Sequence, residues 1–232
     1  MGGGGFQMEP ENTLLDDHVL ALARERSGRA TPRICLIPTA SADDPTLIET
    51  FRTLFPPPRA EPDVLSLFNR PDEDLADVIR RHDAVYVTGG STANLFALWR
   101  LHGLDRVLRR AWSEGVVMAG MSAGAICWFE SGTTDSFGPT LQALHGGLGI
   151  LDGSLIPHYH EEPQRRPLTL ALVGDATLPP GYAVDDGAAL VFEDRRFVEA
   201  VASDATAGAW RVEPDGDGGA LETALDVRVL RR

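Results

Sequence analysis

The chain has 232 residues, with 21 Lys and Arg against 34 Asp and Glu, so its formal net charge is −13, and 43% of its residues are hydrophobic. This length predicts one domain, residues 1–232, that can bury a layered core without disulfides or a structural metal. The acidic balance argues against nucleic-acid binding through phosphate neutralisation, and no apolar run approaches the roughly 20 residues that a membrane-spanning helix needs. We therefore expect short peptides, other small molecules or its own copies as partners, and the chain could form a homodimer. Two cysteines and no secretory leader indicate reduced thiols and a cytoplasmic location.

Apolar runs typical of buried strands alternate with segments of helical period up to about residue 180. We expect strands at 34–38, 64–68, 84–88, 116–118 and 148–156. We expect helices at 12–29, 44–55, 72–81 and 91–114, the last broken at Gly103. This alternation predicts an α/β fold, a three-layer structure with an open, mostly parallel sheet and helices on both faces. Short strands at 188–192, 197–202, 210–212 and 227–230 make residues 181–232 a β-rich C-terminal part of the same domain.

The clearest chemical motif is Gly120-Met121-Ser122-Ala123-Gly124, which follows a short apolar strand. A G-x-S-x-G sequence between a strand and a helix is typical of a tight turn that exposes a nucleophilic serine above the carboxyl ends of the strands. The backbone N–H of Ala123 would lie at the helix N-terminus, where it can donate to a developing oxyanion. Taken by itself, the pentapeptide is explained as well by a serine N-cap with glycines for close packing. The position of the motif between a strand and a helix favours a nucleophilic serine.

A second glycine pair, Gly89-Gly90, follows a predicted strand and precedes an amphipathic helix. It is expected at the same edge of the sheet as Ser122, so the N–H of Gly90 could be a second oxyanion donor. We take Gly89 and Thr92 as candidate substrate-binding residues. An ordinary helix start, capped by Ser91 or Thr92, is the alternative.

A serine nucleophile needs a general base, and the best-placed of the six histidines are His158 and His160. They follow the apolar strand at 148–156, and side chains two residues apart share one face of an extended chain. One can act as the base and the other can line the site and contact substrate. The other four fall in predicted helices or in a glycine-rich loop: His18, His82, His102 and His145.

A carboxylate must orient the base and stabilise its charged form. Of the three acids between Ser122 and His158, Asp135 is the candidate because it follows two β-branched threonines just past the expected serine turn. Glu130 is the alternative, and Asp152 is better explained by a turn with the following glycine. A solvated surface acid is the competing interpretation for each. The histidine follows the serine by only 158 − 122 = 36 positions, which disfavours an esterase of the α/β-hydrolase fold.

Several separated motifs, in this order, resemble the S51 serine peptidases, a family that includes peptidase E, the aspartyl dipeptidase, and the cyanophycinases. They are Val87-Thr88-Gly89-Gly90-Ser91-Thr92, Gly120-Met121-Ser122-Ala123-Gly124-Ala125, Thr133-Thr134-Asp135 and Pro157-His158-Tyr159, with Asp186-Gly187 beyond. The resemblance implies a fold like that of the class I glutamine amidotransferases, with serine in place of their cysteine. It implies Ser122 as nucleophile, His158 as base because it matches the family's Pro-His pair, and the amides of Gly90 and Ala123 as the oxyanion hole.

Three features depart from the family pattern. Residues 1–6 contain a glycine run without the strand that usually precedes it, which indicates a truncated first strand or a linker. The spacing around Asp135 differs from that of peptidase E. Selectivity for an N-terminal aspartate needs a cation facing the substrate carboxylate, and Arg165 and Arg166 occupy the expected region beside two glutamates that could neutralise them.

The expected function is hydrolysis of short peptides by a serine peptidase that resembles dipeptidase E and works through an acyl-enzyme, without metal or cofactor. Acidic-residue selectivity is an open option. One alternative is a metal-assisted hydrolase that uses the His158/His160 pair and loses activity to chelators. Another is a non-catalytic protein of the same fold that binds a small ligand without turnover.

Overall fold

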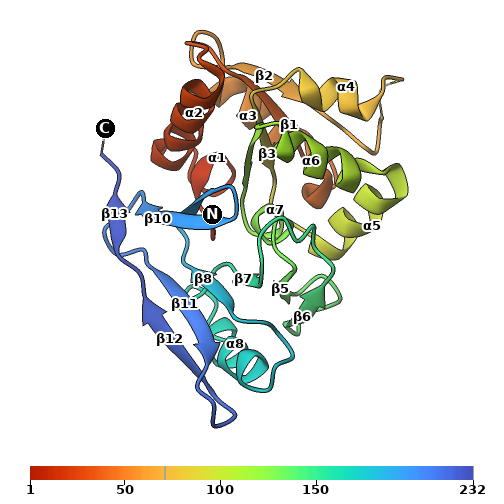
Figure 1. Ribbon diagram of the computed structural model, residues 1–232. Helices are drawn as coiled ribbons and strands as arrows, with labels where there is room; N and C mark the ends of the chain where they lie inside the picture. The colour runs from red at the N-terminus through yellow and green to blue at the C-terminus, as the bar shows by residue number, and fades with distance from the viewer. Residues whose placement is uncertain (71, 232) are drawn as a thin grey trace. The chain divides into compact units, whose positions relative to one another are not determined.

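In the computed structural model, which describes residues 1–70 and 72–231, the chain divides into two compact units. The N-terminal unit is Gly5–Gly124, and the C-terminal unit combines Met1–Gly4 with the chain from Ala125 onward. Each unit contains sheet and helix, and the α/β architecture predicted from the sequence is confirmed (Figure 1).

The N-terminal unit is built on a four-stranded, fully parallel sheet of strand order β2-β1-β3-β4. Its strands are β1 (Arg33–Ile37), β2 (Glu61–Val64), β3 (Ala84–Val87) and β4 (Val117–Gly120). All four residues of β3 are buried, as expected for a central strand covered on both faces. The predicted strand at 64–68 is wrong in position, because the edge strand β2 ends at Val64.

Two groups of helices accompany this sheet: α1 contacts α2 and α3, and α6 contacts α4 and α5 (Figure 1). They are α1 (Gly5–Met8), α2 (Leu14–Ser27), η1 (Thr39–Ser41), α3 (Pro45–Leu54), α4 (Leu75–Arg80), α5 (Thr92–His102) and α6 (Leu104–Ser113). Asp44 caps α3 by accepting the N–H of Thr46 at 2.7 Å. The break predicted at Gly103 is confirmed, since this residue has φ +73° and ends α5.

The glycine run at the start of the chain is an integral part of the fold. Gly3 forms a parallel β-bridge with Asp186, and the N–H of Gly2 donates to the carbonyl of Ala188 at 3.1 Å. Phe6, in α1, is only 1% exposed. These contacts do not fit the linker interpretation of residues 1–6, and the single bridge at Gly3 fits the truncated first strand.

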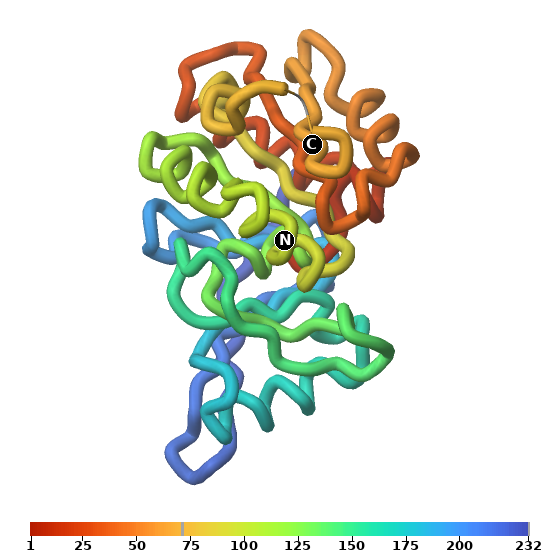
Figure 2. The backbone as a smooth tube through the Cα atoms, turned by 90° about the vertical axis from the view of Figure 1, so that its right-hand side faces the viewer, coloured from red at the N-terminus to blue at the C-terminus, as the bar shows by residue number. Residues whose placement is uncertain are grey.

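The C-terminal unit contains a six-stranded mixed sheet, β12-β11-β8-β7-β5-β6, and a three-stranded sheet, β13-β10-β9. Its elements are β5 (Ser131–Thr134), β6 (Gln142–His145), β7 (Ser154–Ile156), α8 (Arg165–Gly174), β8 (Gly181–Val184), β9 (Ala188–Glu193), β10 (Arg196–Ala202), β11 (Ala209–Pro214), β12 (Ala220–Ala224) and β13 (Val227–Val229). The helix α8 packs against β11 and β12, which form the long hairpin visible in both views (Figures 1 and 2). Tyr159 and, from α8 itself, Val173 belong to a buried core cluster of this unit.

The β-rich C-terminal part was predicted, but β5, β6, β8 and β12 were not. β6 and β12 are edge strands with exposed positions, so they lack the continuous apolar run on which the prediction depended. The short helix α7 (Ala123–Ile126) connects the two units along the chain. No helix in the described part of the chain is long and apolar enough to cross a membrane.

Candidate active site

Ser122 lies in the turn between β4 and α7 and has a left-handed backbone, with φ +52°. A non-glycine residue in this region costs of order 1–3 kcal/mol, and such residues cluster at functional sites. The side chain is partly exposed, whereas Met121 and Ala123 on either side are buried. This is the strained strand-to-helix turn that the G-x-S-x-G motif predicts.

The two glycines of the motif are required by close packing. A Cβ on Gly120 would overlap the carbonyl oxygen of Gly124, and a Cβ on Gly124 would overlap that of Val87 in β3. The turn is therefore tight only because both positions lack a side chain. It lies directly against the end of β3, from which the Gly89-Gly90 loop emerges.

That loop approaches the serine closely within the same unit. A Cβ placed on Gly89 would lie 3.2 Å from the Cβ of Ser122. Gly90 is exposed, and within the described residues its N–H has no hydrogen-bond acceptor. The N–H of Ala123, the first residue of α7, has no acceptor inside the helix. Neither predicted oxyanion donor is therefore taken by an acceptor within the described residues.

Two candidate substrate-binding residues in this region occupy other roles. The N–H and carbonyl of Gly89 both bond to the side chain of Gln7, so they are not open to a substrate. Thr92 is 2% exposed at the start of α5, whose N-cap is Ser91. The prediction that Gly89 and Thr92 contact substrate is not supported by these positions.

In the C-terminal unit, His158 is held by a carboxylate. Its Nδ1 lies 2.5 Å from Oδ1 of Asp186, and the two side chains are 13% and 20% exposed. A carboxylate only accepts, so Nδ1 carries a proton; in the neutral ring this leaves the lone pair on Nε2, the form in which imidazole acts as a base. His158 also has a left-handed backbone, with φ +52°.

The carboxylate that binds His158 is therefore Asp186, which corrects the prediction of Asp135. β7 and β8 are parallel neighbours in which Ile156 pairs with Ala183, so the residues just after them emerge at the same sheet edge. His158 follows the first strand and Asp186 the second. Asp186 lies beyond His158 in the chain, in the Asp186-Gly187 motif, and so outside the interval from Ser122 to His158 in which the acid was expected.

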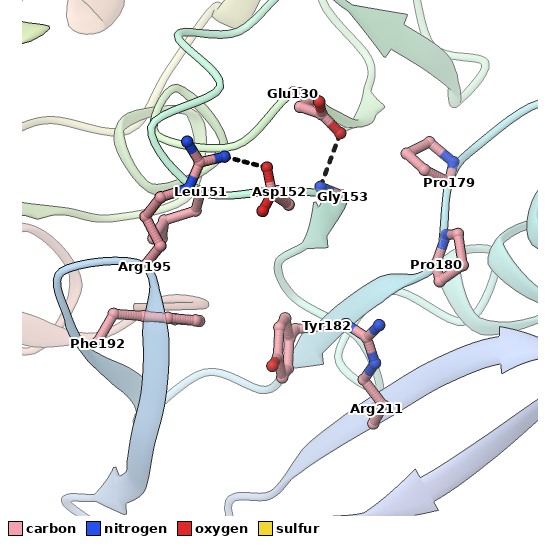
Figure 3. A pocket seen from close by; sticks show the side chains of 10 residues that line it. All are labelled: Glu130, Leu151, Asp152, Gly153, Pro179, Pro180, Tyr182, Phe192, Arg195 and Arg211. Carbon is pink, nitrogen blue, oxygen red and sulfur yellow. Dashed lines mark hydrogen bonds and ion pairs between the residues drawn. The ribbon is translucent and has the colours of Figure 1, made fainter.

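The three acids that were considered lie elsewhere in the C-terminal unit. Asp135 lines a small cavity of about 180 Å³ with Glu161 and Glu162. Glu130 accepts the N–H of Gly153 at 2.8 Å and lines a separate cavity of about 390 Å³ (Figure 3). Asp152, at the rim of that second cavity, forms an ion pair with Arg195 (Figure 3).

His160 forms a second histidine–aspartate pair, with Nδ1 2.9 Å from Oδ1 of Asp185. The Asp185 side chain is only 7% exposed and also accepts the N–H of Gly208 at 3.0 Å. The ring of His160 lies edge-on to Trp210, with centroids 4.5 Å apart, and its side chain is 43% exposed. Substrate contact by His160 stays a prediction.

Both arginines that were predicted to face a substrate carboxylate are paired with other groups of the protein. Arg165 is 4% exposed and donates to Glu162 at 2.8 Å and to Thr133 Oγ1 at 3.0 Å. Arg166 donates to both oxygens of Glu222, at 2.9 and 3.0 Å, and these bonds lower the pKa of that glutamate. Both guanidinium groups hold α8 to its surroundings, which corrects the expectation that they face a substrate carboxylate.

The two cysteines and the possible metal-ligating side chains are the other candidates for the chemistry of the site. Cys35 and Cys127 are fully buried, and burial raises the pKa of both thiols, so neither is a ready thiolate. Within the described residues, no three His, Cys, Asp or Glu side chains are grouped to hold a metal ion. His158 and His160 bind separate aspartates, an arrangement that does not favour the metal-assisted alternative.

Comparison with known proteins finds a matching peptidase family. The model of the peptidase family S51 matches residues 1–200. An uncharacterized peptidase of Bacillus subtilis strain 168, YgaJ, is 49% identical over 212 residues, which cover 91% of this chain and 90% of the relative.

Two solved structures share the fold. A peptidase from an acI-B1 Actinobacterium superposes with a TM-score of 0.69 at 19% identity, covering 98% of this chain and 92% of the other. A putative peptidase E protein from Listeria monocytogenes EGD-e gives a TM-score of 0.56 at 16% identity, covering 90% of this chain and 95% of the other. At these identities the likeness concerns the fold alone.

Proposed function

Because the chain belongs to peptidase family S51, we propose that it is a serine peptidase that cleaves short peptides with Ser122, His158 and Asp186 as its catalytic triad. The observation that carries the proposal is the strained backbone of Ser122, held between two glycines beside two backbone N–H groups that have no acceptor within the described residues. Strain of this kind persists only where surrounding structure enforces it. A serine that served only as a helix cap would have the ordinary extended backbone of an N-cap.

The proposed reaction is acyl transfer. Nε2 of His158 takes the proton of Ser122 Oγ while that oxygen attacks the peptide carbonyl, and Asp186 stabilises the imidazolium that results. The amides of Gly90 and Ala123 donate to the oxyanion. His158 then gives its proton to the leaving amine, and water repeats the sequence to release the acid.

Two observations support the roles of His158 and Asp186. The hydrogen bond on Nδ1 fixes the tautomer in which Nε2 is a base, and the left-handed backbone of His158 is a second strained position in the chain.

Acidic-residue selectivity is the least supported part of the proposal, because Arg165 and Arg166 are both engaged by glutamates. A panel of Asp-X, Glu-X and neutral dipeptides, with blocked and longer analogues, measures this selectivity directly. Equal kcat/KM across the panel would remove selectivity from the proposal and leave the peptidase.

The test of the function is Ser122→Ala. We expect this variant to lose turnover on every peptide of the panel while its thermal unfolding stays that of wild type. The matched control is Ser113→Ala, on the exposed surface of α6, which should keep full activity. Wild-type turnover by Ser122→Ala would overturn the proposal, and loss of wild-type activity to a chelator, but not to a serine-reactive phosphonate, would favour the metal-assisted alternative.

A further inference from the structure

The side chain of Gln7 binds both backbone groups of Gly89. Its Oε1 accepts the N–H of Gly89 at 2.8 Å, and its Nε2 donates to the carbonyl of Gly89 at 3.4 Å. A glutamine amide that pairs with the N–H and C=O of one residue does what an adjacent strand does in a sheet. The contact lies next to the nucleophile, because a Cβ on Gly89 would be 3.4 Å from Gln7 Nε2 and 3.2 Å from Ser122 Cβ.

Gln7 is held in place by its neighbours in α1. The ring of Phe6 packs among Phe51, Phe55 and Tyr86, with centroid distances of 5.3, 5.9 and 5.1 Å. The N–H of Phe6 donates to the buried carboxylate of Asp16. A four-residue helix is too short to be stable alone, so these contacts fix the position of Gln7.

The bond to the carbonyl of Gly89 has a consequence for Gly90. In a trans peptide the C=O of one residue and the N–H of the next point in opposite directions. Because the Gly89 carbonyl points toward Gln7, the Gly90 N–H must point away from it, and this amide is the exposed one that has no acceptor within the described residues.

The loop needs such a restraint because two glycines in succession allow a peptide plane to rotate at little cost. On the far side the N–H of Ser91 donates to the carbonyl of Ala40 at 2.8 Å, and Gly90 has φ +137°, with that carbonyl where its Cβ would be. The hydrogen bond from Ser91 fixes the end of the loop but not the orientation of the peptide plane that joins Gly89 to Gly90. Gln7 is the side chain that fixes this plane.

We propose that Gln7 is a positioning residue that holds the Gly89–Gly90 peptide in the orientation in which the Gly90 N–H can donate to an oxyanion. The proposal rests on the proposed serine-peptidase function. It predicts that Gln7 acts only where negative charge develops on the carbonyl oxygen, so its loss should lower kcat and leave KM almost unchanged.

The test compares two substitutions of similar size. Gln7→Met keeps the length of the side chain and removes both hydrogen bonds, whereas Gln7→Glu keeps an acceptor for the Gly89 N–H but loses the donor to its carbonyl. Using the dipeptide that wild type cleaves fastest, we expect both to lower kcat about 10- to 100-fold with KM within about twofold, a loss bounded by the 10²–10³ typical of one oxyanion donor. Gln142→Met, at an exposed position of β6, is the control and should behave as wild type.

A second readout separates positioning from a structural role. A peptide aldehyde with the same acyl residue forms a tetrahedral adduct with the serine, and we expect Gln7→Met to weaken it by the same factor as kcat. Binding of an unreactive amide analogue should not change. A purely structural Gln7 would lower the melting temperature and weaken both ligands equally, and would tolerate glutamate.

The outcomes distinguish this inference from the function on which it rests. If Ser122→Ala is inactive while both Gln7 variants keep the kcat and aldehyde affinity of wild type, the inference is wrong and the peptidase stands. If Ser122→Ala keeps wild-type turnover, the function itself fails. Should Gln7→Met not fold, Gln7→Glu decides the question, because wild-type kcat in that variant would overturn the inference.

Discussion

At the scale of single residues, the sharpest prediction concerns which carboxylate serves His158. Asp186→Asn should lower kcat by roughly 10²–10⁴, because an asparagine at Nδ1 can reverse the tautomer and does not stabilise the imidazolium. Asp135→Asn is the matched control and should change kcat by less than about threefold. Steady-state kinetics on the fastest dipeptide measures both, and the reverse ranking would reinstate Asp135.

Asp16 gives a prediction about pH. It is 1% exposed, one of its oxygens has no hydrogen-bond partner within the described residues, and burial raises its pKa from 3.8 to about 6. A carboxyl whose pKa is higher in the folded state favours folding below its unfolded pKa, and this contribution is lost as pH rises through the folded value. The ionised form therefore costs roughly 3 kcal/mol above pH 6.

Asp16→Asn removes this ionisation. The free energy of unfolding of the variant minus that of wild type should be larger at pH 7 than at pH 4, by up to roughly 3 kcal/mol. Most of this increase should occur between pH 4 and 6. Urea unfolding of both proteins at several pH values measures the difference. A difference that stays constant from pH 4 to 7 would mean that Asp16 titrates in the folded protein as it does in the unfolded chain.

At the scale of elements, α1 depends on the ring of Phe6. Phe6→Ala should destabilise the protein by about 3–5 kcal/mol, because the side chain is fully buried among three other rings. Phe68→Ala is the control in the same unit, since Phe68 is 55% exposed and its loss should change stability by less than about 0.5 kcal/mol. The two free energies of unfolding come from urea titrations, and similar values would show that α1 is not held by its aromatic ring.

The elements also show what could be predicted from the sequence. The serine turn depends on a local pattern, a strand followed by G-x-S-x-G and small residues, so Ser122 and its flanking glycines could be identified. The identification of Asp186 requires knowing which strands are neighbours, because this residue contacts His158 only through the parallel pairing of β7 and β8. The contact of Gln7 with Gly89 could not be predicted either, because it depends on how the buried Phe6 positions α1. Pairing and docking of this kind are long-range, and periodicity within one segment does not carry them.

At the scale of the whole molecule, the net charge of −13 is a source of self-repulsion in the folded state. Salt screens it, so raising NaCl from about 10 to 150 mM should increase the melting temperature, by about 2–4 °C for each kcal/mol of repulsion relieved. Glu49→Lys combined with Asp226→Lys changes the net charge from −13 to −13 + 4 = −9, with one substitution in each unit. Both side chains are exposed, and neither forms an ion pair within the part of the chain that the structure describes.

The double variant should therefore melt higher than wild type at low salt and gain less from added NaCl. Differential scanning calorimetry of both proteins at the two salt concentrations measures this, and replacing NaCl with KCl separates screening from binding of a particular cation. An equal salt response in the two proteins would attribute the salt effect to individual ion pairs, such as those of Arg166 and Arg228, and not to the overall field.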